Sequence, residues 1–418
     1  MINLKINGTP IAAGEGSTIL DAARANGIHI PTLCYLADCA PDSSCRVCVV
    51  EVAGVPRLMP ACSTKVSEGM EVLTHSEKVL SSRRITLDLI CRHHRMDCEY
   101  CSRYSNCELH GLLRELGMDD RVYANVHREQ EKDFSSPAII RDGSKCVLCR
   151  RCEKVCEKQG IHAIGALNRA AETKIGSIVP MPESGCIGCG RCLAVCPTGA
   201  LSIKDEAKPL RTAQNKGKTI IFALSPFIQN SGKLVSILHC MGVHKVFDGS
   251  GFIAMAAEEV KAELALGKKG ISPLCPSAAK LVDAQILGRH PEAIFNEWCA
   301  KKYGENIFTV WVSPCTALKA EHQCDFAMTE IELYDHILRS CVSRYTMRQV
   351  WSDAVEETFD SSVASSRLRD ELSPAISGCM TLSVKGAADI KKAGKDFDFA
   401  DLLACPGGCA CGGGYLKM

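Results

Sequence analysis

The sequence lacks the features by which several classes of protein are recognised. No stretch of 18 apolar residues occurs in its 418 residues, so no membrane-spanning helix is predicted. The formal net charge is only +1 and aromatic residues make up 5%, so neither attraction to nucleic acid or anionic membranes nor a base-stacking surface is expected. No Gly-x-Gly-x-x-Gly motif follows a predicted strand, and no other flavin or nicotinamide motif is visible. Substrate oxidation is therefore expected on another subunit.

The first residues also lack the marks of export. Residues 1–8 form a short alternating segment ending in Asn7-Gly8, without a long apolar core or a twin arginine. We therefore expect a cytoplasmic protein. Cysteine, by contrast, is abundant, with 27 residues that fall largely into tight clusters. In a cytoplasmic chain such clusters are more often metal ligands than disulfides.

The pattern of apolar residues predicts a multidomain chain of the α+β and α/β classes. Residues 28–62 are rich in Cys, Pro and Ser and are expected to form a loop wrapped on something other than a core. The last third alternates helices and strands, the rhythm of an α/β domain. The expected elements are strands at 2–6, 219–225 and 307–313, helices at 17–26 (capped by Ser17), 77–91, 108–117, 232–241 and 253–266, and a polar linker at 204–218.

The first cysteine group consists of Cys34, Cys45, Cys48 and Cys62. Two irons bridged by two sulfides need four thiolates from a loop that folds around them. The Cys-x10-Cys-x2-Cys-x13-Cys spacing, behind a strand and a helix, resembles the N-terminal [2Fe–2S] domain of complex I-type and [FeFe]-hydrogenase subunits. A zinc site is the alternative interpretation. Cys39 fits no ligand role and is interpreted as an ordinary loop thiol.

The second group, His94, Cys98, Cys101 and Cys107, supplies one imidazole and three thiolates. Without its context, the pattern would also suit a zinc site. Directly after a [2Fe–2S] domain, it resembles the His/Cys-ligated [4Fe–4S] module of the same families. One imidazole in place of a thiolate leaves the cluster less negative and shifts its potential. His93 is the rival ligand, and the spacing favours His94.

The third group is two copies of Cys-x2-Cys-x2-Cys-x3-Cys, the strongest signal in the chain. In two-cluster ferredoxins the fourth cysteine of each copy ligates the other cluster. This rule assigns Cys146, Cys149, Cys152 and Cys196 to one [4Fe–4S] cubane, and Cys186, Cys189, Cys192 and Cys156 to the other. Two adjacent cubanes are suited to passing single electrons.

The fourth group is dispersed and comprises Cys275, Cys315, Cys405 and Cys409. Scattered cysteines are usually buried, inert thiols. Here Cys405 and Cys409 lie in a Cys-Pro-Gly-Gly-Cys loop before a triple glycine, where the backbone can approach a cluster closely. The four residues are therefore candidates for one more [4Fe–4S] cluster.

The order and spacing of all four groups resemble the multi-cluster catalytic subunit of [FeFe]-hydrogenases. Lys245-Val246-Phe247-Asp248 and Glu258-Glu259 add to the resemblance. Residues 1–207 match closely, whereas the remainder matches in islands and looks shortened. The resemblance implies a β-grasp [2Fe–2S] domain over 1–78, a helical His/Cys [4Fe–4S] module over 79–118, a 2[4Fe–4S] ferredoxin-like domain over 137–207 and an α/β hydrogenase-like domain over 219–418.

In that family the last domain holds the H-cluster, a cubane bridged by cysteine to a diiron unit with CO, cyanide and a dithiolate. The resemblance implies that Cys275, Cys315, Cys405 and Cys409 hold the cubane and that Cys409 is the bridging thiolate. The family's proton-delivering cysteine is here Leu274, and its cyanide-binding lysine is Leu318, with Lys319 one residue off. Further departures are Ser313 for a methionine, Cys411 for a glycine, and Tyr415-Leu416 for Gln-Pro.

These departures affect the diiron surroundings and leave the cubane ligands in place. Without the lysine, no charge complements an anionic cyanide in a dry pocket. We therefore expect four [4Fe–4S] clusters and one [2Fe–2S] cluster without a diiron unit, about 18 irons per chain.

The preferred functional hypothesis is an electron-transfer subunit of a soluble NAD(P)H- and ferredoxin-linked complex, a class that includes electron-bifurcating enzymes. The resemblance implies flavin- and NAD(P)-binding partner subunits similar to the complex I NADH module, with formate as a conceivable third couple. One alternative is an [FeFe]-hydrogenase with an atypical proton path. The other is a redox sensor or scaffold, for which no signalling module is visible.

Overall fold

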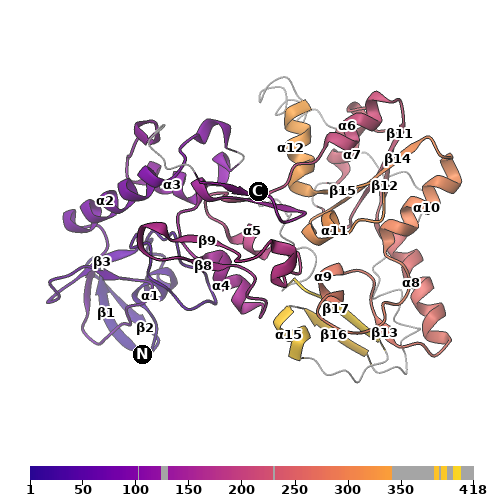
Figure 1. Cartoon of the computed structure of the whole chain (residues 1–418). Helices are drawn as coiled ribbons and strands as arrows, with labels where there is room; N and C mark the ends of the chain where they lie inside the picture. Colours follow the sequence, from indigo (N-terminus) through magenta and orange to yellow (C-terminus); the bar gives the residue numbers. More distant parts are fainter. Residues whose placement is uncertain are drawn as a thin grey trace.

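The computed structural model describes residues 1–101, 103–123, 130–228, 231–340, 381–385, 387–392 and 399–405. A small β-sheet is followed along the chain by a helical segment, a cysteine-rich region and a larger α/β region. Figure 1 shows the N-terminal sheet and the α/β region at opposite ends of the molecule, with the cysteine-rich helices α4 (Arg151–Lys158) and α5 (Arg191–Val195) between them. Across the described residues, no helix combines the length and apolar character needed to cross a bilayer.

The N-terminal part is a five-stranded sheet with strand order β2-β1-β5-β3-β4 and one helix packed on it. Asn7 and Gly8 adopt positive φ angles of 52° and 82° and join β1 to β2, so the predicted hairpin is confirmed. The predicted cap at Ser17 is wrong, because Thr18 and Asp21 form a reciprocal capping box instead. The elements are β1 (Ile2–Ile6), β2 (Thr9–Ala13), α1 (Ile19–Ala25), β3 (Val49–Val52), β4 (Met59–Pro60) and β5 (Glu71–Leu73).

Two helices, α2 (Glu77–His93) and α3 (Glu108–Glu115), make up the helical segment, and both were predicted. Short 3-10 turns surround α3: η1 (Cys98–Tyr100), η2 (Tyr104–Asn106) and η3 (Asp120–Tyr123). Leu87 of α2 and Leu113 of α3 share a buried core with Leu33 and Val47 from the preceding loop. The cysteine-rich loop thus packs on the helical segment as well as on its own sheet.

The cysteine-rich region repeats its backbone as well as its sequence. Leu148 and Arg150 have left-handed φ angles of 52° and 60°, and the equivalent Gly188 and Gly190 have 72° and 67°. Such turns point successive amides into one concavity, as in many iron–sulfur sites. The elements are β6 (Lys132–Asp133), β7 (Ile139–Asp142), η4 (Gly143–Lys145), α4 (Arg151–Lys158), β8 (Gly165–Leu167), η5 (Ala170–Glu172), β9 (Lys174–Gly176), η6 (Met181–Ser184), α5 (Arg191–Val195) and β10 (Leu201–Ile203).

The segment predicted as a polar linker, 204–218, contains helix α6 (Lys208–Asn215). Its Pro209 occupies the first turn, where the missing amide costs nothing. Leu210 and Ala213 lie one turn apart and are buried in the core of the following region. The linker prediction was wrong because two apolar residues in a polar stretch were enough to anchor a short helix.

The α/β region has a four-stranded parallel sheet, β12-β11-β14-β15, with helices on both faces. One face packs on α6, α7 and α12, and the other on α8 and α10, so the predicted α/β architecture is confirmed. A second parallel sheet, β13-β17-β16, lies beside α9 and α15 (Figure 1). The elements are β11 (Thr219–Leu224), α7 (Ser231–Cys240), β12 (Lys245–Asp248), α8 (Ser250–Ala265), β13 (Gly270–Ile271), α9 (Pro276–Ala279), α10 (Pro291–Tyr303), β14 (Ile307–Ser313), α11 (Thr316–Ala320), β15 (Phe326–Thr329), α12 (Glu330–Ser340), β16 (Thr381–Lys385), α15 (Ala387–Lys392) and β17 (Phe399–Leu403).

Candidate metal centres

The structure brings the four thiols of the first group together at the edge of the N-terminal sheet. A hydrogen bond from Cys45 lowers the pKa of Cys34 to about 5, and one from Cys48 lowers the pKa of Cys62 to about 6. The same contacts, followed by burial, raise the pKa of Cys45 and Cys48. Since the negative charge of Cys34 also acts on Cys62, the two pairs are neighbours. This arrangement suits a dinuclear cluster held by four thiolates.

Helix α2 braces the loop that carries two of these thiols. Arg83 is buried, and its Nε and Nη2 atoms donate to the carbonyl oxygens of Val47 and Val49 at 3.0 and 2.8 Å. These bonds satisfy carbonyls on either side of Cys48. The loop is therefore held by hydrogen bonds to a charged group as well as by packing.

His94 meets the requirements of a ligand better than His93 does. His94 is buried, and its Nδ1 atom has no hydrogen-bond partner. Burial, then the charge of Lys145, lowers the pKa of His94 to about 4, so the ring is neutral at pH 7 and able to bind metal. His93 is exposed, and its Nδ1 lies 3.0 Å from the carbonyl oxygen of Leu89.

The three thiols of the second group follow His94 around the 3-10 turns. Burial raises the pKa of Cys98 to about 12, and the charges of Asp120, Cys107 and Cys101 add to the effect. Cys107 is the N-cap of α3. The Nζ atom of Lys145 lies 3.7 Å from the Sγ atom of Cys101. Three thiols and one unpartnered imidazole nitrogen form the donor set predicted for a His/Cys-ligated cluster.

The eight thiols of the repeat fall into two groups in space. Burial, then the charges of neighbouring thiols, raises the pKa of Cys152 and of Cys192. The thiols that act on Cys152 include Cys146, Cys149 and Cys196. Those that act on Cys192 are Cys156, Cys186 and Cys189. The two groups are the two ligand sets predicted from the crossed pattern, and Cys152 faces both because Cys192 also acts on it.

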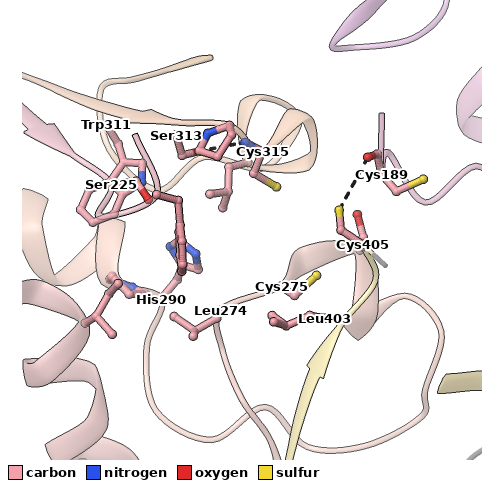
Figure 2. A pocket seen from close by; sticks show the side chains of 16 residues that line it. Cys189, Ser225, Leu274, Cys275, His290, Trp311, Ser313, Cys315, Leu403 and Cys405 are labelled. Atoms are coloured by element: carbon pink, nitrogen blue, oxygen red, sulfur yellow. Dashed lines mark hydrogen bonds between the residues drawn. The ribbon is translucent and has the colours of Figure 1, made fainter. Parts of the chain in front are cut away.

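Three of the four dispersed cysteines lie around one cavity in the α/β region (Figure 2). Cys275 precedes α9, Cys315 precedes α11, and Cys405 follows β17. Burial, then the charge of Cys275, raises the pKa of Cys315 to about 12. The amide of Ala404 donates to the Sγ atom of Cys275 at 3.4 Å. Cys409, the fourth predicted ligand, lies outside the described residues, as do Cys411, Tyr415 and Leu416.

The cavity between these thiols has about 50 Å³ of free space and a largely apolar lining. Its wall includes Leu274, Leu318 and Trp311, together with Ser313 and the buried His290. Cys189 of the repeat also lines it, and the Sγ atom of Cys405 lies 4.0 Å from the Cys189 carbonyl oxygen (Figure 2). The dispersed thiols therefore adjoin the second group of the repeat.

Hydrogen bonds and ion pairs connect each group to the next. Lys154 pairs with Asp42 at 3.0 Å, which holds the first cysteine loop on α4. Arg103 donates to the carbonyl oxygen of Cys196 at 2.6 Å. Glu108, next to Cys107, accepts two bonds from the buried Arg151 at 2.7 and 2.8 Å. The helical segment is thus joined to the first group of the repeat through charged side chains.

The loop of Cys189 is held by the two helices that follow Cys275 and Cys315. Ser277 donates to the carbonyl oxygen of Ile187 at 2.7 Å, and Thr316 donates to that of Gly188 at 2.6 Å. Each donor sits one or two residues after a predicted ligand of the last group. Both bonds position the second group of the repeat against the cavity.

Sequence reasoning missed several residues that surround these groups. Lys145, Arg151, His290 and Glu292 carry charge or can titrate, and each is at least partly buried near a thiol. Only Lys145 and Arg151 had a usable signal, since each adjoins a cysteine of the repeat.

No group of three His, Cys, Asp or Glu side chains in the described ranges is arranged to hold a single metal ion.

Comparison with known families defines the class of the protein. The 2Fe-2S iron–sulfur cluster binding domain matches residues 1–77. The iron–sulfur binding region of NADH-ubiquinone oxidoreductase G matches residues 83–121, and the 4Fe-4S dicluster domain matches residues 138–203. The chain is therefore an iron–sulfur protein with [2Fe–2S] and [4Fe–4S] domains.

Over most of its length the chain is similar to hydrogenase subunits. It is 31% identical over 371 residues to the NADP-reducing hydrogenase subunit HndD of Solidesulfovibrio fructosivorans, covering 77% of this chain and 63% of the relative. It is 29% identical over 362 residues to iron hydrogenase 1 of Clostridium pasteurianum, with the same two coverages. It is also 40% identical over 205 residues to the alpha subunit of an NADPH-Fe(3+) oxidoreductase of Geobacter sulfurreducens, covering 49% of this chain and 24% of the relative. The predicted resemblance is confirmed, and the chain spans less than two thirds of each of these relatives.

Proposed function

We propose that the chain is an electron-transfer subunit in which a row of clusters carries single electrons. The first group would hold a [2Fe–2S] cluster, and His94 with its three cysteines a [4Fe–4S] cluster. The repeat would hold two cubanes with crossed ligands, and Cys275, Cys315, Cys405 and Cys409 a last one. The buried, closely grouped thiols and the unpartnered His94 nitrogen support this assignment.

The observation that carries the proposal is the contact between successive groups. Lys154 links the first loop to the repeat, Arg103 and Arg151 link the helical segment to it, and Thr316 links it to the last group. Electron transfer between clusters requires that they be held close and in fixed positions. Each junction here is held by a polar contact to a residue in or beside a cysteine loop.

We further propose that the last site holds a [4Fe–4S] cluster without a diiron unit. Leu274 and Leu318 line the cavity at the positions where the family has a cysteine and a lysine. Lys319 does not take over the lysine's place: it pairs with the buried Glu332, lies 3.9 Å from Glu206 and is not among the cavity residues. With its charge used by these carboxylates, it is unsuited to complement a cyanide ligand.

Partners would supply the chemistry that the chain lacks. The sequence contains no flavin or nicotinamide motif. Two of its relatives are named as an NADP-reducing hydrogenase subunit and an NADPH-Fe(3+) oxidoreductase subunit. We therefore propose flavin- and NAD(P)-binding partner subunits in a hetero-oligomer that exchanges electrons with ferredoxin.

The proposal is tested on the anaerobically purified or reconstituted chain. It predicts about 18 irons per chain and separate paramagnetic resonance signals for the [2Fe–2S] and [4Fe–4S] clusters on stepwise reduction. NADPH or NADH alone should leave these signals absent, and addition of the flavin partner should produce them. Direct reduction of the isolated chain by a nicotinamide would contradict the assignment of substrate oxidation to a partner.

An [FeFe]-hydrogenase is the second candidate, because Cys275, Cys315 and Cys405 still surround a cavity. The observation that favours it is the likeness to iron hydrogenase 1 across 77% of this chain. Hydrogen evolution by protein co-produced with diiron maturation enzymes would support it. No evolution from protein with a full set of cubanes would remove it.

A further inference from the structure

Lys145 lies next to a cysteine of the repeat in the sequence, but its side chain contacts a cysteine of the second group. It directly precedes Cys146, the first predicted ligand of the ferredoxin-type cubanes, at the end of η4. Its Nζ atom lies 3.7 Å from the Sγ atom of Cys101, a predicted ligand of the His/Cys cluster. The side chain is only 17% exposed, so its charge is poorly screened by water.

The backbone around Lys145 is held from several sides. Thr198 donates to its carbonyl oxygen at 2.7 Å, and the amide of Arg95 donates to the carbonyl oxygen of Ser144 at 2.8 Å. Asp142 accepts from the amide of Ser144 at 3.1 Å and caps η4. These contacts fix the backbone from which the Lys145 side chain extends toward Cys101.

Lys145 shares its carboxylate partner with a second cation. Asp97 lies 3.7 Å from the Nζ atom of Lys145. The same carboxylate also lies 3.0 Å from the Nε atom of Arg95. One carboxylate shared between two cations cannot neutralise both.

We propose that Lys145 sets the reduction potential of the His/Cys cluster, which rests on the ligand assignment proposed above. Its ammonium donates to the Cys101 thiolate and lies beside the charge that the cluster gains on reduction. Hydrogen bonds to sulfur and positive charge both stabilise the more negative, reduced state. Lys145 thus raises the potential of this cluster above the value that its ligands alone would give.

With a cluster bound, the step that Lys145 influences would be a one-electron transfer: a neighbouring cluster would be oxidised and the His/Cys cluster reduced, with no bond made or broken. The role of Lys145 in it is to hold its charged side chain beside Cys101. Because Lys145 and Cys146 are adjacent in one loop, that loop connects the second cysteine group to the first group of the repeat.

The test is a potentiometric titration of the full chain followed by electron paramagnetic resonance. The His/Cys cluster is identified by the hyperfine coupling of its imidazole nitrogen in pulsed spectra. In Lys145→Met its midpoint potential should fall, and those of the other clusters should stay within error. Lys145→Arg, which keeps the charge, should restore most of the shift. Lys132→Met is the matched control, because Lys132 pairs with Asp142 at 3.6 Å and has no contact with a thiol in the structure.

Three outcomes would refute either the role of Lys145 or the ligand assignment on which it rests. An unchanged potential in Lys145→Met, with the cluster present, would refute the role of Lys145 and leave the ligand assignment standing. Absence of a nitrogen-coupled cluster from the wild-type chain would refute the ligand assignment itself. If Lys145→Met loses the cluster, the effect of the charge is tested by comparing the neutral variant Lys145→Gln with the charged variant Lys145→Arg. Equal midpoint potentials in these two variants would refute an effect of charge.

Discussion

The cluster sites of the first 203 residues and the site of the last domain are built differently. In the first half, charged side chains such as Arg83, Arg103, Lys145 and Arg151 hold the cysteine loops. In the last domain the thiols surround a cavity walled by Leu274, Leu318 and Trp311. In the first half, charged side chains hold loops whose cysteines are close in sequence. In the last domain, strands and helices position cysteines that are far apart in sequence.

The two halves also differ in how they compare with known families. Every predicted ligand in the first half lies in a segment covered by an iron–sulfur family. In the second half, Cys275, Cys315 and Cys405 line a cavity whose wall includes Leu274 and Leu318. The proposal that this site lacks a diiron unit rests on these two leucines, because neither side chain can carry a proton or a charge.

The largest effects are expected from cysteine variants, which test whether the two halves are independent. Cys275→Ser should remove the last cluster, about four irons, and leave the ferredoxin-type signals intact. Cys409→Ser should do the same. Cys152→Ser should instead disturb both cubanes of the repeat, since Cys152 faces Cys192 as well as its own group. Iron analysis and paramagnetic resonance would check this, and loss of all signals in Cys275→Ser would show that the sites are not separate.

Leu318→Ala tests whether the last cavity is a packed wall. Leu318 is buried, and its truncation should cost about 3 kcal/mol of stability through lost burial and an enlarged cavity. Leu73→Ala, at an exposed position of the N-terminal sheet, is the control and should cost far less. Chemical denaturation would compare the two, and equal effects would mean that Leu318 is not packed as described.

Glu292 should make the last domain sensitive to pH. Burial raises the pKa of Glu292 to about 8, although the amide of Gln323 donates to it at 3.0 Å. Its unfolded pKa is near 4.5, so both states hold the proton below that value. Between pH 4.5 and 8 the unfolded chain loses the proton first, and stability falls as pH rises.

Glu292→Gln removes this penalty. The variant should match the wild type at pH 4 and be more stable by about 4 kcal/mol at pH 8. Thermal unfolding across this range would measure the difference. A gain at pH 4 equal to that at pH 8 would show that titration of Glu292 is not the cause.

Arg151→Met tests the charged junctions of the first half and should have a smaller effect than the changes in the last domain. It removes two bonds to Glu108, a half-exposed partner, and should cost about 1.5 kcal/mol. Arg92→Met breaks an exposed pair with Asp88, which water screens, and should cost clearly less. Equal costs in thermal unfolding would mean that the Arg151 junction is no stronger than a surface ion pair.

Contiguous spacing makes thiol groups predictable from the sequence. The structure brings together the thiols of each set predicted from the copies at 146–156 and 186–196, and their role as cluster ligands stays a prediction. The strands at 219–225 and 307–313 were predicted because buried parallel strands are continuous apolar segments.

Reasoning failed where tertiary contacts decide. The choice of Thr18 over Ser17 as a cap depends on Asp21, and α6 depends on a core that accepts Leu210 and Ala213. Lys145 adjoins Cys146, but its contact with Cys101 was not predictable, because that partner is 44 residues away in sequence. The same holds for Glu292, whose burial is set by packing between α10 and the loop at Gln323.

The central claim, a row of clusters that ends without a diiron unit, is tested most directly by infrared spectroscopy. The chain would be co-produced with hydrogenase maturation enzymes and purified without oxygen. The account predicts no iron-bound CO or cyanide stretches from protein that contains about 18 irons per chain. Clear CO and cyanide bands would contradict it, because they would place a diiron unit in the cavity despite Leu274 and Leu318.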